Sequence, residues 1–214
     1  MARSRKQGPV SPDRKSPADR EQADRETPEL RIIGGTLRHR KLLYSGDQRT
    51  RPMKDRVREA VFNLVGPVVV GQHAIDLFAG SGALGFEAIS RGAARGTFIE
   101  QHFPTARLIR QNAALLGVAD RTTVHAANTF IWAQREKIST LEPWLVFSSP
   151  PFSFYLERQA EMLALIGALF EKAPPKSVFV VEADDQFDMS LLPLAAEWDV
   201  RPYWPAVVAI HHRA

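Results

Sequence analysis

Apolar and polar positions along this chain follow a pattern typical of strands and helices in alternation. Short apolar runs predict strands at residues 73–78, 97–100, 122–125, 145–148, 177–183, 197–203 and 207–211. Apolar residues at helical spacing predict helices between them, at residues 83–91, 103–116, 129–137 and 155–170. This regular repeat predicts a doubly wound, Rossmann-like α/β fold with a mostly parallel sheet.

The end of the sheet is predicted to differ from the rest. Only Trp204, Pro205 and Ala206 separate the last two predicted strands. A connection this short predicts a hairpin, so the carboxyl-terminal edge of the sheet should be antiparallel. Plain dinucleotide-binding domains do not require this ending.

The amino-terminal third of the chain has a different pattern. Residues 1–29 are rich in Pro, Arg, Asp and Glu with few apolar residues, which predicts a disordered tail. Residues 30–44 predict a small hairpin with a basic tip and second strand, and residues 55–65 predict a helix with one apolar stripe. We therefore predict a tail, a basic hairpin-and-helix extension over residues 30–66, and an α/β domain over residues 67–214.

The turn after the first predicted strand carries the strongest functional signal. Residues 75–85 read Ile-Asp-Leu-Phe-Ala-Gly-Ser-Gly-Ala-Leu-Gly. Gly80 and Gly82 allow positive φ and the close approach of a ligand to the backbone. Asp76 lies at the carboxyl end of the strand, where open α/β sheets bind ligands, and Glu100 ends the next strand at a spacing suited to a ribose diol. Together they predict an adenosine-type cofactor.

Two other interpretations of this turn stay open. Gly80, Gly82 and Gly85 also satisfy the G-x-G-x-x-G pattern of dinucleotide-binding loops, and Glu100 suits either kind of cofactor. A purely structural turn between a strand and a helix would use the same glycines. Asp76 suits a ligand with a cation or ribose hydroxyls better than one with phosphates.

A second motif follows the fourth predicted strand. It reads Ser149-Pro150-Pro151-Phe152 and should lie beside the glycine turn, across the ligand crevice. Successive prolines fix φ and donate no main-chain hydrogen bond, so rigid carbonyls next to an aromatic ring can hold a planar base by its amino group. Taken alone, the segment is explained more simply as a Pro-rich loop. Combined with the glycine turn, it predicts a site for a nucleobase amine.

Composition excludes several classes of site. The chain has 214 residues and no cysteine, so disulfides, thiolate zinc sites and cysteine-held iron–sulfur clusters are impossible. No apolar run approaches the roughly 18 to 20 residues of a membrane span. The basic N-terminus lacks the apolar segment of a secretory signal, so we predict a cytoplasmic protein. The six histidines are scattered, and we predict no metal site.

Charge is unevenly distributed along the chain. Residues 31–58 carry nine Lys or Arg against two Asp, a net charge of +7, while residues 59–214 carry a net charge of −4. A basic extension on a mildly acidic body predicts a polyanionic partner bound by the extension. A solvated charged surface is the alternative.

These motifs resemble a known family. Asp76-Leu77-Phe78-Ala79-Gly80-Ser81-Gly82 with Ser149-Pro150-Pro151-Phe152 resembles the S-adenosylmethionine-dependent amino-methyltransferases. More narrowly, the chain resembles the bacterial RsmD-type 16S ribosomal RNA guanine-N2 methyltransferases, over about residues 30 to 213. The segments that carry this resemblance are Arg31-Ile32-Ile33-Gly34-Gly35, Arg51-Pro52, Asp55-Arg56-Val57-Arg58-Glu59 and Gly82-Ala83-Leu84-Gly85-Phe86-Glu87-Ala88. The resemblance implies that the cofactor is S-adenosylmethionine. It also implies that the partner is ribosomal RNA or the assembling small ribosomal subunit, and we expect the protein to be a monomer.

The resemblance also implies a role for single residues. The cofactor would be bound by Thr50, Arg51, Pro52, Asp76, Phe78, Gly80, Ser81, Gly82, Glu100 and Asn128. The reacting base would be held by Ser149, Pro150, Pro151 and Phe152. The RNA would be bound by Arg38, Arg40, Lys41, Arg49, Lys54, Arg56 and Arg58. Asn128 is explained equally well as the N-cap of the helix that it precedes.

One position departs from the pattern of the family. The family has Asp or Asn where this chain has Ser149, and that acceptor turns the lone pair of the amine toward the methyl group. Serine is shorter and uncharged, which predicts a slowed enzyme or an altered pose of the base. Ser148 is a second candidate for the role. The alternative functions are an inactive RNA-binding or ribosome-assembly factor, a DNA amino-methyltransferase and an NAD-dependent oxidoreductase.

Overall fold

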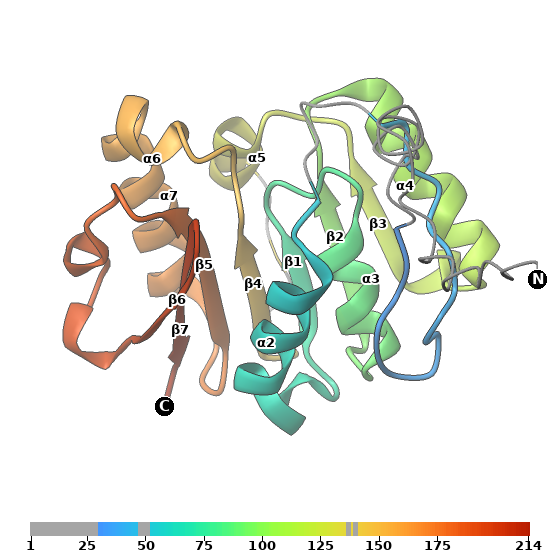
Figure 1. The fold of residues 1–214 in the computed structure, drawn as a ribbon, viewed down its shortest axis with the longest axis horizontal. Coiled ribbons are helices and arrows are strands. Elements are labelled where there is room, and N and C mark those ends of the chain that lie inside the picture. Colours follow the sequence, from blue (N-terminus) through green and yellow to red (C-terminus); the bar gives the residue numbers. More distant parts are fainter. Residues whose placement is uncertain (1–29, 47–51, 136–137, 139–140) are drawn as a thin grey trace, which may run out of the picture.

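The computed structural model describes residues 30–46, 52–135, 138 and 141–214 (Figure 1). Within these residues a seven-stranded sheet has the order β3-β2-β1-β4-β5-β7-β6. The strands are β1 (His73–Asp76), β2 (Arg95–Ile99), β3 (Thr122–His125), β4 (Trp144–Ser148), β5 (Val178–Asp184), β6 (Asp199–Tyr203) and β7 (Ala206–His212). Strands β1 to β5 pair in parallel, while β7 pairs antiparallel with both β5 and β6. The predicted fold class is therefore confirmed, including its antiparallel edge.

Helices cover both faces of the sheet. They are α2 (Asp55–Val65), α3 (Ala83–Ser90), α4 (Phe103–Leu116), α5 (Thr129–Arg135), α6 (Phe154–Glu157) and α7 (Gln159–Lys172). Figure 1 shows α2 and α3 on the near side of the sheet and α7 on the far side. Successive strand residues point to opposite faces, so Ala74 of β1 packs in the core under α2 and α3, and Ile75 packs in the core under α5 and α7. No helix in the described part of the chain is long and apolar enough to cross a membrane.

The order of the strands determines where a ligand can bind. From β1 the chain proceeds outward to β2 and β3, and it then returns to β4 on the other side of β1. This reversal creates a crevice at the carboxyl ends of β1 and β4. Asp76, the last residue of β1, is opposite Phe147 of β4, so the segments that follow both strands begin at the same level of the sheet.

The predicted amino-terminal hairpin forms, but with little regular strand. A single antiparallel bridge joins Arg31 to Lys41, and the amide of Ile32 donates to the carbonyl of Arg40 at 3.0 Å. Leu30, Ile32 and Leu42 are buried in a cluster with residues of α3, β2 and α4. The hairpin is therefore packed onto the α/β body.

The prediction of one continuous helix over residues 155–170 was wrong. The structure has two helices, α6 and α7, because Arg158 leaves the helical conformation with φ −128° and ψ 31°. The guanidinium of Arg158 lies 4.0 Å from the ring centroid of Phe130 and 5.2 Å from that of Phe154. Such cation–π contacts depend on the tertiary arrangement, so helical spacing in the sequence cannot reveal the break.

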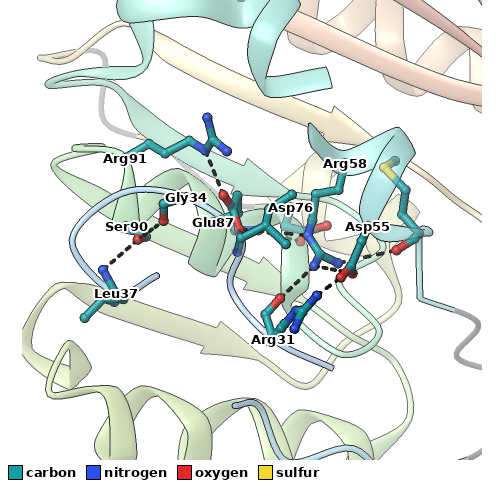
Figure 2. A network of polar contacts seen from close by, with 12 residues as sticks. Arg31, Gly34, Leu37, Asp55, Arg58, Asp76, Glu87, Ser90 and Arg91 are labelled. Atoms are coloured by element: carbon teal, nitrogen blue, oxygen red, sulfur yellow. Dashed lines mark hydrogen bonds and ion pairs between the residues drawn. The ribbon is translucent and has the colours of Figure 1, made fainter. Parts of the chain in front are cut away.

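A buried ion pair connects the hairpin, α2 and α3 (Figure 2). Arg58 of α2 and Glu87 of α3 have fully buried side chains with 3.9 Å between Nε and Oε2. Nη2 of Arg58 donates to the carbonyl of Arg31 at 2.7 Å and to Asp55 Oδ1 at 2.9 Å. Oε2 of Glu87 accepts from the amide of Ile33 at 2.8 Å. These contacts fasten the hairpin to both helices.

This network corrects one predicted RNA contact. Arg58 points into the protein with no exposed surface, so it cannot bind phosphate as predicted. Burial lowers the pKa of Arg58, and the negative charges of Asp55 and Glu87 act in the opposite direction. A charge at this depth requires its partners, because an unpaired buried charge is strongly destabilising.

The variant Glu87→Gln tests this dependence. We expect it to lower the free energy of unfolding by about 3 kcal/mol, because Arg58 then keeps only the partly exposed Asp55 as an ionic partner and Arg91 loses its ion pair with Glu87. Urea unfolding followed by circular dichroism measures the change. Glu59→Gln removes an exposed carboxylate from α2 and is the matched control. Equal, small effects of the two variants would show that the buried pair is not needed for stability.

Candidate active site

A cavity of about 620 Å³ lies at the carboxyl ends of the parallel strands. Its volume is in the range of sites that bind cofactors and other small molecules. The glycine turn after β1 contributes Gly80 and Ser81 to its lining, and the segment after β4 contributes Ser149 and Pro150. The two motifs singled out in the sequence therefore line one cavity.

The glycine turn is held in place by two carboxylates. The amide of Gly80 donates to Oε2 of Glu100 at 2.9 Å, and the amide of Gly85 donates to Oδ2 of Asp76 at 3.2 Å. Gly82, with φ +78°, is in the left-handed region that favours glycine and directly precedes α3. A Cβ on Gly85 would lie 2.3 Å from the ring of Phe98, so glycine is needed for α3 to approach β2 this closely.

Asp76 is fully buried yet incompletely paired. Its Oδ1 has no hydrogen-bond partner among the described residues, and the side chain lines the cavity. Burial raises the pKa of Asp76 to about 7, and the amides of Gly85 and Phe78 only partly offset this rise. A buried, unpaired carboxylate oxygen is satisfied by a ligand that brings a cation or a hydroxyl hydrogen.

Glu100 and Asn128 line the same cavity from neighbouring strand ends. Oε1 of Glu100 accepts from the amide of His102 at 2.7 Å, so each carboxylate oxygen receives one backbone hydrogen and keeps a lone pair. Oδ1 of Asn128 accepts from the amides of Phe130 at 3.0 Å and Ile131 at 3.3 Å. Asn128 is therefore the N-cap of α5, the structural role that the sequence left open, and it also lines the cavity.

The segment of residues 149–152 after β4, the proline segment, forms a polar pair in the cavity with a residue of β5. The hydroxyl of Ser149 donates to Oε2 of Glu182, which is buried near the carboxyl end of β5. Pro150 is buried and Pro151 exposed, and both line the cavity. Ser148, the second candidate for the acceptor role, is excluded by its position. Its side chain is buried and contacts the hydroxyl of Tyr155 at 3.0 Å, outside the cavity lining.

Aromatic rings form one wall of the cavity. Phe78, Phe130 and Phe154 are mutual neighbours, with ring centroids 6.0 to 6.4 Å apart. Phe152 adds a fourth ring to the lining. Such a wall offers faces and edges against which a planar base can pack.

The structure brings most of the predicted site residues together. Those that line the cavity are Pro52, Asp76, Phe78, Gly80, Ser81, Glu100, Asn128, Ser149, Pro150, Pro151 and Phe152. Gly82 shapes the turn but does not line the cavity. Thr50 and Arg51, and Arg49 of the predicted RNA contacts, lie outside the described residues. Arg38, Arg40, Lys41, Lys54 and Arg56 are exposed, and Lys54 also lines the cavity.

The lining residues that were not predicted as site residues include Phe130 and Phe154 of the aromatic wall and two further parts of the cavity. Glu182 is one, although an acid that interrupts the apolar run of β5 near its end was visible in the sequence. The turn between β6 and β7 is the other, with Trp204 and Pro205 in the lining. Only the antiparallel return of β7 along β5 brings this turn to the cavity, so no local pattern of residues indicates its place in the site.

The fold and the cavity together define a Rossmann-like methyltransferase. The chain is similar to the solved structure of the putative methyltransferase yhhF from Escherichia coli, with a TM-score of 0.71 and 31% identity over 86% of this chain and 98% of that one. An RNA methyltransferase from Salinibacter ruber in complex with S-adenosyl-L-homocysteine has the same fold, with a TM-score of 0.56 and 21% identity over 76% of this chain and 94% of that one.

Sequence comparison assigns the family. Residues 30–199 match the family model described as Conserved hypothetical protein 95, and the chain belongs to this family. It is 34% identical to the ribosomal RNA small subunit methyltransferase D of Escherichia coli K12, over 80% of this chain and 82% of the relative. It is 36% identical to the protein of the same name from Haemophilus influenzae, over 62% of this chain and 68% of the relative. The resemblance drawn from the motifs is thereby confirmed.

The raised pKa of Asp76 predicts how stability depends on pH. In the folded protein Asp76 keeps a proton up to about pH 7, whereas in the unfolded chain it loses that proton near pH 4. Stability should therefore fall as the pH rises between these values, by about 3 kcal/mol from pH 5 to pH 8.

The variant Asp76→Asn cannot ionise and should lose this part of the pH dependence. Its stability relative to the unaltered protein should increase from pH 5 to pH 8, as measured by urea unfolding of the ligand-free proteins. Asp120→Asn, which changes an exposed residue, is the matched control and should leave the pH dependence unaltered. Parallel stability curves for Asp76→Asn and the unaltered protein would contradict the assignment.

Proposed function

We propose that this protein transfers a methyl group from S-adenosylmethionine to the N2 amino group of a guanine in small-subunit (16S) ribosomal RNA. The observation that carries the proposal is that one cavity joins the glycine turn and its acids, Asp76 and Glu100, to the segment at residues 149–152. A methyl donor and a nucleobase amine can meet in such a cavity. The relatives that are named ribosomal RNA small subunit methyltransferases support the choice of substrate.

The residues of the cavity fit this cofactor. When bound, S-adenosylmethionine supplies a methyl group on a positively charged sulfonium, and it also carries an ammonium group and two ribose hydroxyls. The unpaired Oδ1 of Asp76 suits a cationic group, and the remaining lone pairs of Glu100 suit the ribose hydroxyls. Asn128, which the resemblance assigns to the edge of the adenine, lines the cavity, and so does the ring of Phe130. Thr50 and Arg51 stay predictions for the amino-acid end.

The part of the cavity formed by residues 149–152 suits the amine of a base. Ser149 and the carbonyl of Pro150 would accept hydrogens from the amino group, and Phe152 would stack on the ring. Methyl transfer is an in-line displacement, so the protein contributes mainly position and electrostatic stabilisation. The guanine must be exposed from a loop or flipped out, because base pairing and stacking hide its amine.

Exposed basic residues of the amino-terminal segment would hold the RNA. Lys54 lines the cavity, whereas the tip of the hairpin packs against the carboxyl-terminal ends of α3 and α4. Arg38, Arg40 and Lys41 lie in the second half of the hairpin, and Lys54 and Arg56 lie at the start of α2. Their charge would attract the phosphate backbone of any nucleic acid, so the preference for RNA over DNA rests on the relatives. A monomer in the cytoplasm, where ribosomal subunits assemble, is part of this proposal.

Mapping the methylated nucleotide tests the proposal. The protein is incubated with labelled S-adenosylmethionine and immature small ribosomal subunits, and we expect a single N2-methylguanine in the 16S RNA. Tight binding of RNA without transfer would indicate an assembly factor instead. A thermal shift with NAD but none with S-adenosylhomocysteine would indicate an oxidoreductase, and transfer to DNA in preference to RNA would indicate a DNA methyltransferase.

Glu100→Ala serves as the loss-of-cofactor variant in this assay. Removing a charged acceptor of two ribose hydrogen bonds should weaken cofactor binding by about 10- to 100-fold. RNA affinity should stay unchanged, as measured by filter binding. An equal loss of both affinities would argue against separate cofactor and RNA sites.

The salt dependence of RNA affinity tests the basic hairpin. Replacing Arg38, Arg40 and Lys41 by Ala should reduce the slope of log affinity against log salt by about 2 to 3, because each phosphate contact adds about 0.7 to 0.9. The matched control replaces three exposed basic residues of α7, the loop after it and β6, namely Lys172, Lys176 and Arg201. A slope that changes equally in both variants would show that the hairpin is not the RNA contact.

A further inference from the structure

Ser149 and Glu182 come from neighbouring strands and meet inside the cavity. Strands β4 and β5 pair in parallel with Ser148 opposite Val181, so the next residues along, Ser149 and Glu182, also lie side by side. Both line the cavity, and the serine hydroxyl donates its hydrogen to the carboxylate. The pair is therefore built into the register of the sheet.

The direction of this hydrogen bond determines what Ser149 can do. A hydroxyl has one hydrogen to donate and two lone pairs that accept. Because Glu182 receives the hydrogen of Ser149, the serine oxygen is left with lone pairs only. Toward any further group in the cavity, Ser149 is then an acceptor. A serine without such a partner could point its hydrogen at the substrate just as well.

Glu182 is also the carboxylate on the side of the cavity where the amine would lie. Of the described residues, three buried acids line the cavity: Asp76, Glu100 and Glu182. Asp76 and Glu100 accept backbone hydrogens of the glycine turn. Glu182 instead contacts the first residue of the proline segment. Its burial raises the pKa, and the hydrogen bond from Ser149 lowers it in part, so the carboxylate is a better proton acceptor than an exposed one.

We propose that Ser149 and Glu182 act as one unit on the amine, with Ser149 as the acceptor that contacts the amino group and Glu182 as the positioning residue and final proton acceptor behind it. This inference rests on the proposed function. It assigns Glu182 a role in the transfer step, and it explains how a serine can serve in a position that calls for a strong acceptor.

The transfer step balances in atoms and charge. The lone pair of the amine attacks the methyl carbon, the new N–C bond forms, and the electron pair of the broken C–S bond stays on sulfur. The nitrogen then gives one proton to Ser149 Oγ while the serine hydroxyl passes its own hydrogen to Glu182. The positive charge of the sulfonium and the negative charge of Glu182 disappear together. The cavity holds one fewer charge of each sign afterwards, which favours the step in a site of low polarity.

The variant Glu182→Gln tests the role of Glu182. It keeps the size of the side chain but removes the proton acceptor, so kcat should fall by about 100-fold or more. The affinities for S-adenosylhomocysteine and for RNA, which the unit does not determine, should stay within about threefold. Asp185→Asn, an exposed acid just after β5, is the matched control and should keep full activity.

Rescue distinguishes this role from a merely structural one. In the double variant Ser149→Asp/Glu182→Gln, a carboxylate contacts the amine directly, so kcat should recover at least about tenfold relative to Glu182→Gln. A double-mutant cycle based on protein stability measures the coupling between Ser149 and Glu182 and needs no bound cofactor. The shifts in urea midpoint of Ser149→Ala and Glu182→Gln should not add in the double variant, because the two residues share one hydrogen bond.

The outcomes separate this inference from the proposed function. An active protein whose Glu182→Gln variant keeps kcat within about threefold would overturn the role of Glu182 and leave the proposed function intact. Additive stability effects in the cycle would overturn the pair itself. A protein that methylates no small-subunit RNA would overturn the proposed function, and the role of the pair in transfer would fall with it.

Discussion

The glycine turn after β1 depends on two carboxylates, one at the end of β1 and one directly after β2. Glu100 accepts the amide of Gly80, and Asp76 accepts the amide of Gly85, so the backbone of the turn is fixed before any ligand arrives. Both acids also line the cavity. The groups that shape the turn are therefore the same groups that would meet the cofactor. Such preorganisation lowers the entropic cost of binding. The same burial that holds Asp76 in place raises its pKa in the ligand-free protein.

The basic amino-terminal segment contains two kinds of basic side chain, buried and exposed, and the net charge of the segment does not distinguish them. Arg58 points inward and, with Glu87, joins α2 to α3, while the amide of Ile33 links the hairpin to the same carboxylate. Arg38 and Arg56 point outward. The inward contacts fix the segment on the body of the protein, and the outward charges are thereby held at a fixed position relative to the cavity. A loosely tethered basic tail would attract RNA without orienting it.

The sequence predicted the sheet and the two motifs that meet in the cavity, because both follow from local patterns. Apolar runs give strands, and the glycines and prolines stand where the chain must turn. The errors share one cause. The inward direction of Arg58, the helix break at Arg158 and the site position of Glu182 all depend on partners from distant elements, namely Glu87, Phe130 and Ser149. Periodicity in the sequence carries no information about such partners.

The electrostatics of the cavity favour an uncharged acceptor such as serine at position 149, next to Pro150 and Pro151. Glu182 is already buried at this point, so a second carboxylate in contact with it would add like-charge repulsion and further desolvation. A hydroxyl that donates to Glu182 supplies an oxygen acceptor at the same place without a second charge. In the proposed complex the negative charge would lie on Glu182, next to Ser149, and would balance the positive charge of the methyl donor. Under the proposal, the departure from Asp or Asn at position 149 and the presence of Glu182 would be two parts of one arrangement, in which acceptor and charge are divided between neighbouring strands.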